Sequence, residues 1–237
     1  FSLVIDRNYI VENVSQSGEV PATGYVPSGV YDADGADGDD FRTVGGDYYK
    51  PTDADYEANC DEARQLLADA GYPNGEGFPV VEYLYNTSDA HKAVAEALQF
   101  MWEEELGVKV TLNNQEWAAF LQTRKDGDYS IARNGWIADY NDPCSFLDMW
   151  YTDGGNNDAQ YSNPDYDAAI DAAKATSDPE ERMKAFHEAE DILIGQDSVL
   201  APIYFYTQPY MLNPDIDGMY YTPLGYFFFG YTSKTAE

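Results

Sequence analysis

Four charged or titratable side chains in the middle of the chain are the best candidates for chemistry. His91, Arg124, Arg133 and Asp139 fall at the predicted starts and ends of helices and strands. Open α/β sheets place their ligands where a strand ends and the next helix begins. The position of these four side chains therefore favours a ligand-binding role.

Each of the three cations also has a purely structural alternative. Arg133 lies inside a predicted strand beside Ile131 and Trp136, where a charge needs a partner because arginine is seldom buried unpaired. For Arg124, a helix C-terminal cation that meets the helix dipole is as well favoured as ligand binding. For His91, the pattern alone favours an ordinary surface or hydrogen-bonded histidine.

No pattern in the chain predicts catalysis, a cofactor or a metal. The two histidines, His91 and His187, lie outside any His-Glu-x-x-His motif and away from a cysteine pair, so a zinc ligand set is absent. The chain also lacks a Gly-x-Ser-x-Gly nucleophile elbow and the common phosphate-binding glycine loops. Paired carboxylates suit a glycosidase, but among 43 acidic residues some pair is inevitable. We therefore expect a binding protein and not an enzyme.

The composition is strongly acidic and rich in aromatic residues. With 13 Lys and Arg against 43 Asp and Glu, the formal net charge is −30, which excludes nucleic acid as a partner and disfavours an anionic membrane surface. Hydrophobic residues make up 44% of the 237 residues, enough for a folded core. The 21 tyrosines suit either an adaptable binding surface or aromatic strands.

Hydrophobic periodicity predicts an α/β fold, with a parallel or mixed sheet flanked by helices. Cap residues, apolar stripes and terminal glycines predict the helices, and short apolar runs predict the strands. The predicted helices span residues 52–70, 88–106, 118–125, 164–176 and 179–194, after a helix-like start at 1–14. The predicted strands span residues 79–85, 108–112, 129–138 and 199–206.

Residues 18–50 are rich in Gly, Pro, Asp and Tyr and predict a long irregular segment. Its run from Asp32 to Asp40 fails the EF-hand template, because position 5 is Ala36 and position 12 is Thr43. A solvated acidic loop is therefore favoured over a calcium site.

Cys60 and Cys144 are far apart in the sequence, and we interpret them as two separate buried thiols. No apolar run approaches the length of a membrane span, and the longest, Val199–Tyr206, contains a proline. The chain does not begin with Met and has no signal peptide at its start, so we expect it to be part of a longer protein.

The block Asn134-Gly-Trp-Ile-Ala-Asp-Tyr-Asn-Asp-Pro-Cys-Ser-Phe-Leu147 resembles the extracytoplasmic oligopeptide-binding proteins of ABC peptide importers. The similarity continues in collinear blocks along nearly the whole chain: Ile5-Asp-Arg7, Ala70-Gly-Tyr72-Pro, Leu84-Tyr-Asn-Thr-Ser-Asp89, His91-Lys92, Asn114-Gln-Glu-Trp117 and Thr123-Arg124. The resemblance implies one lobe of a type II periplasmic-binding-protein-like fold, from the C-terminal part of a two-lobed receptor.

The resemblance also implies a role for each candidate residue. Asp139 is similar to the carboxylate that receives the α-ammonium of the peptide. His91, Arg124 and Arg133 resemble alternative partners of the ligand carboxylate, used at different peptide lengths. The strand Gly135, Trp136 and Ile137 resembles the one whose backbone pairs with the extended ligand, and Trp117 resembles a position in a side-chain pocket.

For the whole protein the resemblance implies delivery of oligopeptides to an ABC permease outside the cytoplasm, with a lipid anchor and a missing N-terminal lobe. Residues 1–206 would form the C-terminal lobe, and residues 207–237 a tail that returns to the other lobe and leaves its aromatic residues partly uncovered here. The acidic segment between Val30 and Asp47 departs from the family pattern, and we assign it no role.

Two alternatives remain open at this point. The same scaffold carries dipeptides, nickel, haem or oligosaccharides in other receptors, because fold does not decide cargo. The less favoured alternative is a secreted glycan-active or glycan-binding domain that uses the Tyr and Trp surface.

Overall fold

The computed structural model describes residues 1–222 and 224–234 and contains a three-stranded parallel sheet in the order β3-β2-β4. The strands are β2 (Val81–Asn86), β3 (Val110–Gln115) and β4 (Ile131–Ala132). Strand β2 pairs along its full length with β3, from Val81↔Val110 to Asn86↔Gln115. Because the chain passes from β2 to β3 on one side and then crosses to β4 on the other, the order reverses at β2.

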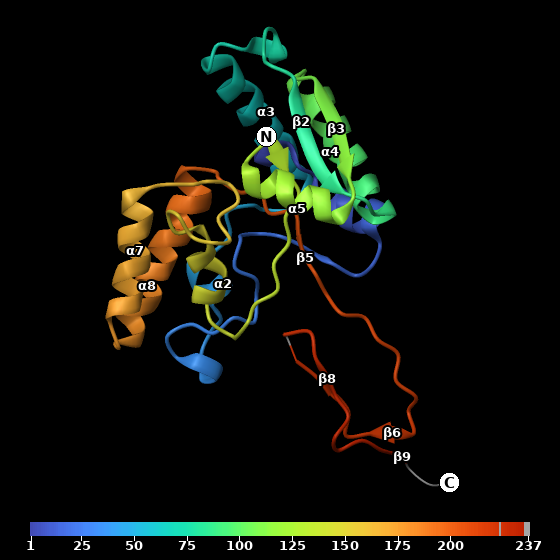
Figure 1. Ribbon diagram of the computed structural model, residues 1–237, viewed down its shortest axis with the longest axis vertical. Helices are drawn as coiled ribbons and strands as arrows, with labels where there is room; N and C mark the ends of the chain where they lie inside the picture. Colours follow the sequence, from blue (N-terminus) through green and yellow to red (C-terminus); the bar gives the residue numbers. More distant parts are fainter. Residues whose placement is uncertain (223, 235–237) are drawn as a thin grey trace.

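Three helices accompany this sheet (Figure 1): α3 (Asp53–Asp69), α4 (Asp89–Leu106) and α5 (Trp117–Asp126). Ser88 caps α4, and Gly107 ends it in the left-handed conformation at φ 67°, as glycine commonly does. The buried stripe of α4 is Val94, Ala95, Leu98, Met101, Trp102 and Leu106. Together with Val81, Tyr83 and Val110 from the sheet it forms the first hydrophobic core.

A second core belongs to a helical part that lies apart from the sheet (Figure 1). Its helices are α2 (Phe41–Gly45), α6 (Cys144–Leu147), α7 (Pro164–Ala175) and α8 (Pro179–Glu190), and a π-helical turn, η6 (Asp191–Gln196), follows α8. Proline stands at the start of both α7 and α8, and Asn163 and Asp178 cap them. Phe41, Tyr166 and Phe186 are fully buried in this core.

Shorter elements complete the chain. They are η1 (Ser2–Val4), α1 (Arg7–Tyr9), η2 (Ile10–Ser15), β1 (Val20–Pro21), η3 (Gly35–Asp37), η4 (Pro73–Gly75), η5 (Asp148–Trp150) and β5 (Tyr204–Phe205). Strands β1 and β5 pair antiparallel, with Val20 opposite Phe205. Because β1 comes from the start of the chain and β5 from near its end, this ladder joins two distant segments.

The tail after β5 extends away from both cores (Figure 1). Antiparallel pairs form between β6 (Ile216–Asp217) and β9 (Ser233–Lys234), and between β7 (Tyr220–Tyr221) and β8 (Phe227–Phe228). Large apolar side chains of this tail are exposed, among them Met211, Tyr226, Phe229 and Tyr231. The expectation that its aromatic residues are left partly uncovered is confirmed.

The predicted α/β class with flanking helices is confirmed, but two predicted strands are much shorter than expected. Of residues 129–138 only Ile131–Ala132 are strand, because the chain leaves β2 after Arg133, whose N–H still donates to the Leu84 carbonyl at 2.8 Å. Of residues 199–206 only Tyr204–Phe205 are strand, because their partner β1 is two residues long and Pro202 has no N–H to donate.

The acidic segment 18–50 is more ordered than the sequence predicts. Val30 and Phe41 enter the second core, and α2 forms with Asp40 as its cap. Arg42 is 4% exposed and pairs at 2.7 Å with Glu190, which is 0% exposed. This order has a physical cause: a long-range ion pair fixes the segment, and no local sequence pattern encodes that pair.

Cys60 and Cys144 are free and buried, each in a different core, as expected. Within the described residues, no helix combines the length and apolar character needed to cross a bilayer. Over the same residues, no group of three or more His, Cys, Asp or Glu side chains is arranged to hold a metal ion.

Candidate functional site

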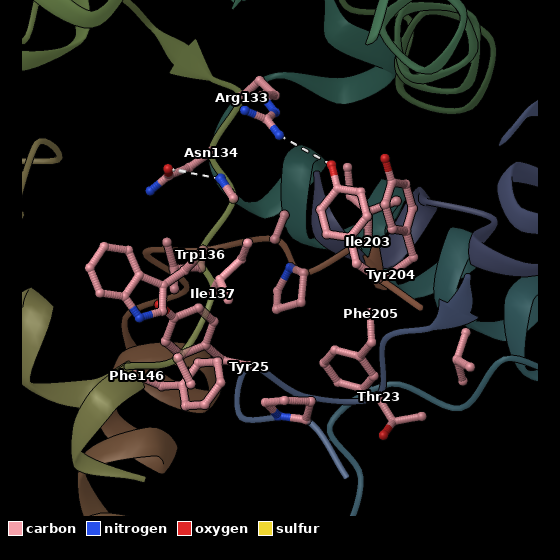
Figure 2. A pocket seen from close by; sticks show the side chains of 18 of the residues that line it. Thr23, Tyr25, Arg133, Asn134, Trp136, Ile137, Phe146, Ile203, Tyr204 and Phe205 are labelled. Atoms are coloured by element: carbon pink, nitrogen blue, oxygen red, sulfur yellow. Dashed lines mark hydrogen bonds between the residues drawn. The ribbon is translucent and has the colours of Figure 1, made fainter. Parts of the chain in front are cut away.

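A cavity of about 1510 Å³ lies between the two cores and receives residues from both (Figure 2). Its wall is formed by the segment after β4, by the β1–β5 ladder with the residues that flank it, and by parts of β2 and α4. This position follows from the topology, since the carboxyl ends of β2 and β4 flank the point where the strand order reverses.

Arg133 is the first residue after β4 and lines the cavity. Its Nη2 donates to the Tyr206 hydroxyl at 3.1 Å (Figure 2), and among the described residues no carboxylate pairs with it. Arg133 therefore has a partner, as the sequence leads us to expect, but it lies just outside the strand and this partner is a neutral hydroxyl. The charge of Arg133 stays available to a ligand.

His91 stands in the first turn of α4, directly after β2, and also lines the cavity. Burial lowers the pKa of its imidazole, and the nearby Arg133 charge lowers it further, while the Asn86 carbonyl opposes the shift. His91 is therefore neutral at neutral pH, and it can gain a proton when an anion approaches.

The segment from Asn134 to Ala138 runs along the cavity without a strand partner. Trp136 packs against the second core and donates its indole N–H to the Ser145 carbonyl at 2.6 Å, whereas Ile137 is 69% exposed. Figure 2 shows their side chains on opposite sides of the segment, the alternation of extended chain. Among the described residues, the backbone N–H and C=O groups of Trp136 and Ile137 have no hydrogen-bond partner.

Arg124 lines the cavity but is already engaged. Its Nε lies 2.7 Å from an oxygen of Asp158, and its Nη1 donates to the Asn134 side-chain oxygen at 2.8 Å. The same Asn134 oxygen accepts the Gly135 N–H at 2.8 Å. The guanidinium also lies 5.2 Å from the centre of the Phe120 ring.

Asp139 and Trp117 are not brought into the cavity wall. Asp139 is exposed beside the lining residue Ala138, its N–H donates to Ser145 Oγ at 2.8 Å, and its carboxylate has no partner among the described residues. Trp117 begins α5, is half exposed and stacks on Phe120 with ring centres 5.7 Å apart. The other expected residues, His91, Arg124, Arg133, Gly135, Trp136 and Ile137, all line the cavity.

Sequence reasoning missed several residues of this site. Tyr83, Tyr204 and Tyr206 face the cavity, and burial raises the pKa of Tyr83 and Tyr204, so their hydroxyls remain protonated. Asp158 and Asn134 were missed too, although they hold Arg124. Tyrosine and aspartate are so abundant here that no pattern distinguishes these members.

The chain is similar to proteins of known class. The family of bacterial extracellular solute-binding proteins, family 5 Middle, matches residues 1–158. The periplasmic oligopeptide-binding protein OppA of Salmonella typhimurium is 37% identical over 216 residues, which cover 91% of this chain and 37% of that protein. The dipeptide-binding protein DppE of Bacillus subtilis is 34% identical over 227 residues, 95% of this chain and 40% of that protein.

A solved structure gives the same result for the fold. The crystal structure of Haemophilus influenzae OppA in complex with RPPGFSPFR superposes with a TM-score of 0.77 at 32% identity, covering 94% of this chain and 41% of that one. The chain thus spans about two fifths of the length of the relatives that it matches. The family also includes a haem-binding protein A of Haemophilus influenzae, 26% identical over 227 residues.

Proposed function

The chain belongs to the bacterial extracellular solute-binding proteins of family 5, and on this premise we propose that it is the C-terminal lobe of a receptor for extended oligopeptides. The observation that carries the proposal is the free backbone of Trp136 and Ile137 beside the cavity. An extended peptide adds to such an edge through main-chain hydrogen bonds, which bind without regard to side-chain identity. The names of the relatives, OppA and DppE, support peptide as the cargo.

Charges at the two ends of this segment would fix the peptide termini. The carboxylate of Asp139, which has no partner within the described part of the chain, suits the α-ammonium group at one end. Arg133, assisted by His91, suits the α-carboxylate at the other, because both line the cavity and lie close enough for the Arg133 charge to lower the pKa of His91. Trp117 remains a candidate for a side-chain pocket outside this cavity.

The second lobe would be contributed by chain outside these 237 residues, and closure over the cavity would bury the ligand. Residues 1–206 would act as the ligand-binding lobe and residues 207–237 as the tail that returns to the other lobe, which accounts for its exposed aromatic side chains. In the cell the complete receptor would work outside the cytoplasm, held by a lipid anchor, and would deliver peptides to an ABC permease.

A calorimetric titration of the full-length receptor tests the proposal. Asp139→Ala is expected to cost about 2–5 kcal/mol of binding free energy for a free-amino peptide, the range for removing one partner of a charge pair that becomes buried. N-acetylation of the peptide is expected to weaken wild-type binding and to leave the variant unchanged. Asp39→Ala removes an exposed aspartate that does not line the cavity and serves as the control.

Two results would reject parts of the proposal. Equal affinity of Asp139→Ala and Asp39→Ala for a free-amino peptide would remove Asp139 from the site. Mass spectrometry of the ligand retained through native purification decides the cargo itself, and a dipeptide, haem, a nickel complex or an oligosaccharide in place of an oligopeptide would replace the proposed function. A dipeptide or haem cargo has named relatives behind it.

A further inference from the structure

Arg124 makes a set of contacts that occupies its guanidinium before any ligand arrives. Arg124 and Asp158 are only 14% and 17% exposed, and their side chains pair at 2.7 Å. Asp158 is itself held from another side, because its backbone carbonyl accepts the Tyr129 hydroxyl at 2.9 Å. A ligand carboxylate would have to displace this partly buried carboxylate to reach Arg124.

The second contact of Arg124 leads directly to the free segment. The Asn134 side-chain oxygen accepts from both Arg124 Nη1 and the Gly135 N–H, each at 2.8 Å. Gly135 is two residues past the last ladder bond, which Arg133 donates to Leu84. The contacts from Asp158 through Arg124 and Asn134 to Gly135 therefore fix the point at which the chain leaves the sheet and becomes a free edge.

Arg133 lines the same cavity as Arg124 but is available to a ligand. Among the described residues, Arg133 has no carboxylate partner and only the Tyr206 hydroxyl at 3.1 Å. The resemblance groups Arg124 and Arg133 as alternative partners of the ligand carboxylate, but the two arginines are in different states in the structure. Arg124 is paired with Asp158 and holds Asn134, whereas Arg133 is free to bind a carboxylate.

We infer that Arg124 is a positioning residue, which holds the Asn134–Ile137 segment in the geometry that accepts a peptide backbone, and that Asp158 determines specificity by withdrawing Arg124 from the ligand carboxylate. The inference rests on the proposed peptide-binding function. Its consequence is that Arg133, and not Arg124, reads the peptide C-terminus, so carboxylate recognition is confined to peptides whose C-terminus reaches Arg133.

The binding test uses the full-length receptor with alanine peptides of increasing length, each as the free acid and as the C-terminal amide. Arg124→Met is expected to weaken acid and amide by the same factor, because it disturbs the backbone site. Arg133→Met is expected to weaken only the acids. Asp158→Ala frees Arg124, so the peptide length whose C-terminus reaches Arg124 should gain a preference for the free acid. At that length the acid is expected to bind about tenfold better than the amide, which corresponds to roughly one hydrogen bond to a charged group. The added substitution Arg124→Met should abolish that new preference.

A second readout needs no ligand. Hydrogen exchange of the Gly135 amide is expected to be about tenfold faster in Arg124→Met and in Asn134→Ala, since each removes a contact that holds it, and unchanged in Arg133→Met. Because Asn134 is exposed and takes no part in the Arg124–Asp158 pair, Asn134→Ala is expected to fold and to keep that pair. It therefore tests the positioning role even if Arg124→Met does not fold.

The outcomes separate the inference from the function beneath it. If Arg124→Met, in a receptor that keeps Asp158, weakens the binding of free-acid peptides more than that of their amides at any length, Arg124 contacts the ligand and the inference is overturned. If Gly135 exchange is the same in wild type and Asn134→Ala, the positioning role is overturned. If no peptide binds to any variant while Gly135 exchange responds as expected, the peptide function fails and the positioning role stands.

Discussion

The buried pair between Arg42 and Glu190 gives the sharpest prediction for stability. One oxygen of Glu190 accepts from Arg42 Nη1 at 2.7 Å and from the N–H groups of Tyr25 and Val26 at 2.9 Å each. Glu190→Gln keeps an oxygen for the two N–H groups but leaves the guanidinium without a counter-charge. Removing one partner of such a pair costs about 3–5 kcal/mol, so we expect a loss of that size in the free energy of unfolding.

Urea denaturation measures this loss against a matched surface pair. Arg64 pairs with Asp61 at 2.6 Å and also with Glu105, but these side chains are 42%, 81% and 26% exposed, so Arg64→Met is expected to cost less than about 1 kcal/mol. Replacing both buried partners, by Arg42→Met with Glu190→Leu, is expected to recover only part of the loss. It removes the unpaired charge but leaves the N–H groups of Tyr25 and Val26 without their acceptor.

The stabilising role of the Arg42–Glu190 pair is refuted if Glu190→Gln destabilises the protein no more than Arg64→Met does. In that case water or a shift of the 24–26 loop would solvate the Arg42 charge, and the acidic segment would not depend on the pair. A double variant as stable as wild type would contradict the part assigned to the two N–H groups.

Two further predictions concern titratable groups. Folding lowers the pKa of His91 below the ordinary histidine value of about 6.5. Just below that value the unfolded chain therefore binds more protons than the folded protein, and stability falls as the pH drops. In paired urea titrations, His91→Gln should lose less stability than wild type between about pH 7 and pH 5, and equal losses would contradict this prediction. Burial raises the thiol pKa of both Cys60 and Cys144. Ellman's reagent should therefore label both thiols rapidly in denaturant and neither rapidly in the native protein. Fast labelling of either thiol in the native protein would count against its burial.

The fold could be predicted from sequence wherever local pattern and tertiary packing agree. The stripe and cap of α4 predict its bounds to within one residue, since Ser88 and Gly107 determine both ends locally. The order in the acidic segment could not be predicted in the same way. Arg42 and Glu190 are 148 positions apart, and their pairing leaves no periodic signal in either neighbourhood.

For the candidate site too, the positions of residues could be predicted better than their pairing. Positions at strand ends favoured a ligand-binding role for His91 and Arg133, and both line the same cavity, because two adjacent parallel strands end at one edge of the sheet. The state of each charge could not be predicted. Whether an arginine is open or paired depends on which of 43 acidic side chains the fold brings to it, and Asp158 comes from a loop 34 positions beyond Arg124.

The molecule as a whole is strongly acidic, whereas the charges that line the cavity nearly balance, and this contrast bears on ligand orientation. The net charge is −30, yet the described ionic residues that line the cavity are three arginines, Arg42, Arg124 and Arg133, against Asp47 and Asp158. Two of these arginines are paired, with Glu190 and Asp158. The acidic exterior attracts the ammonium end of a zwitterion and repels its carboxylate. For the peptide ligand proposed above, we therefore expect the anionic end to lie at Arg133, the one lining arginine without a carboxylate partner among the described residues, so that the charges orient the peptide independently of its side chains.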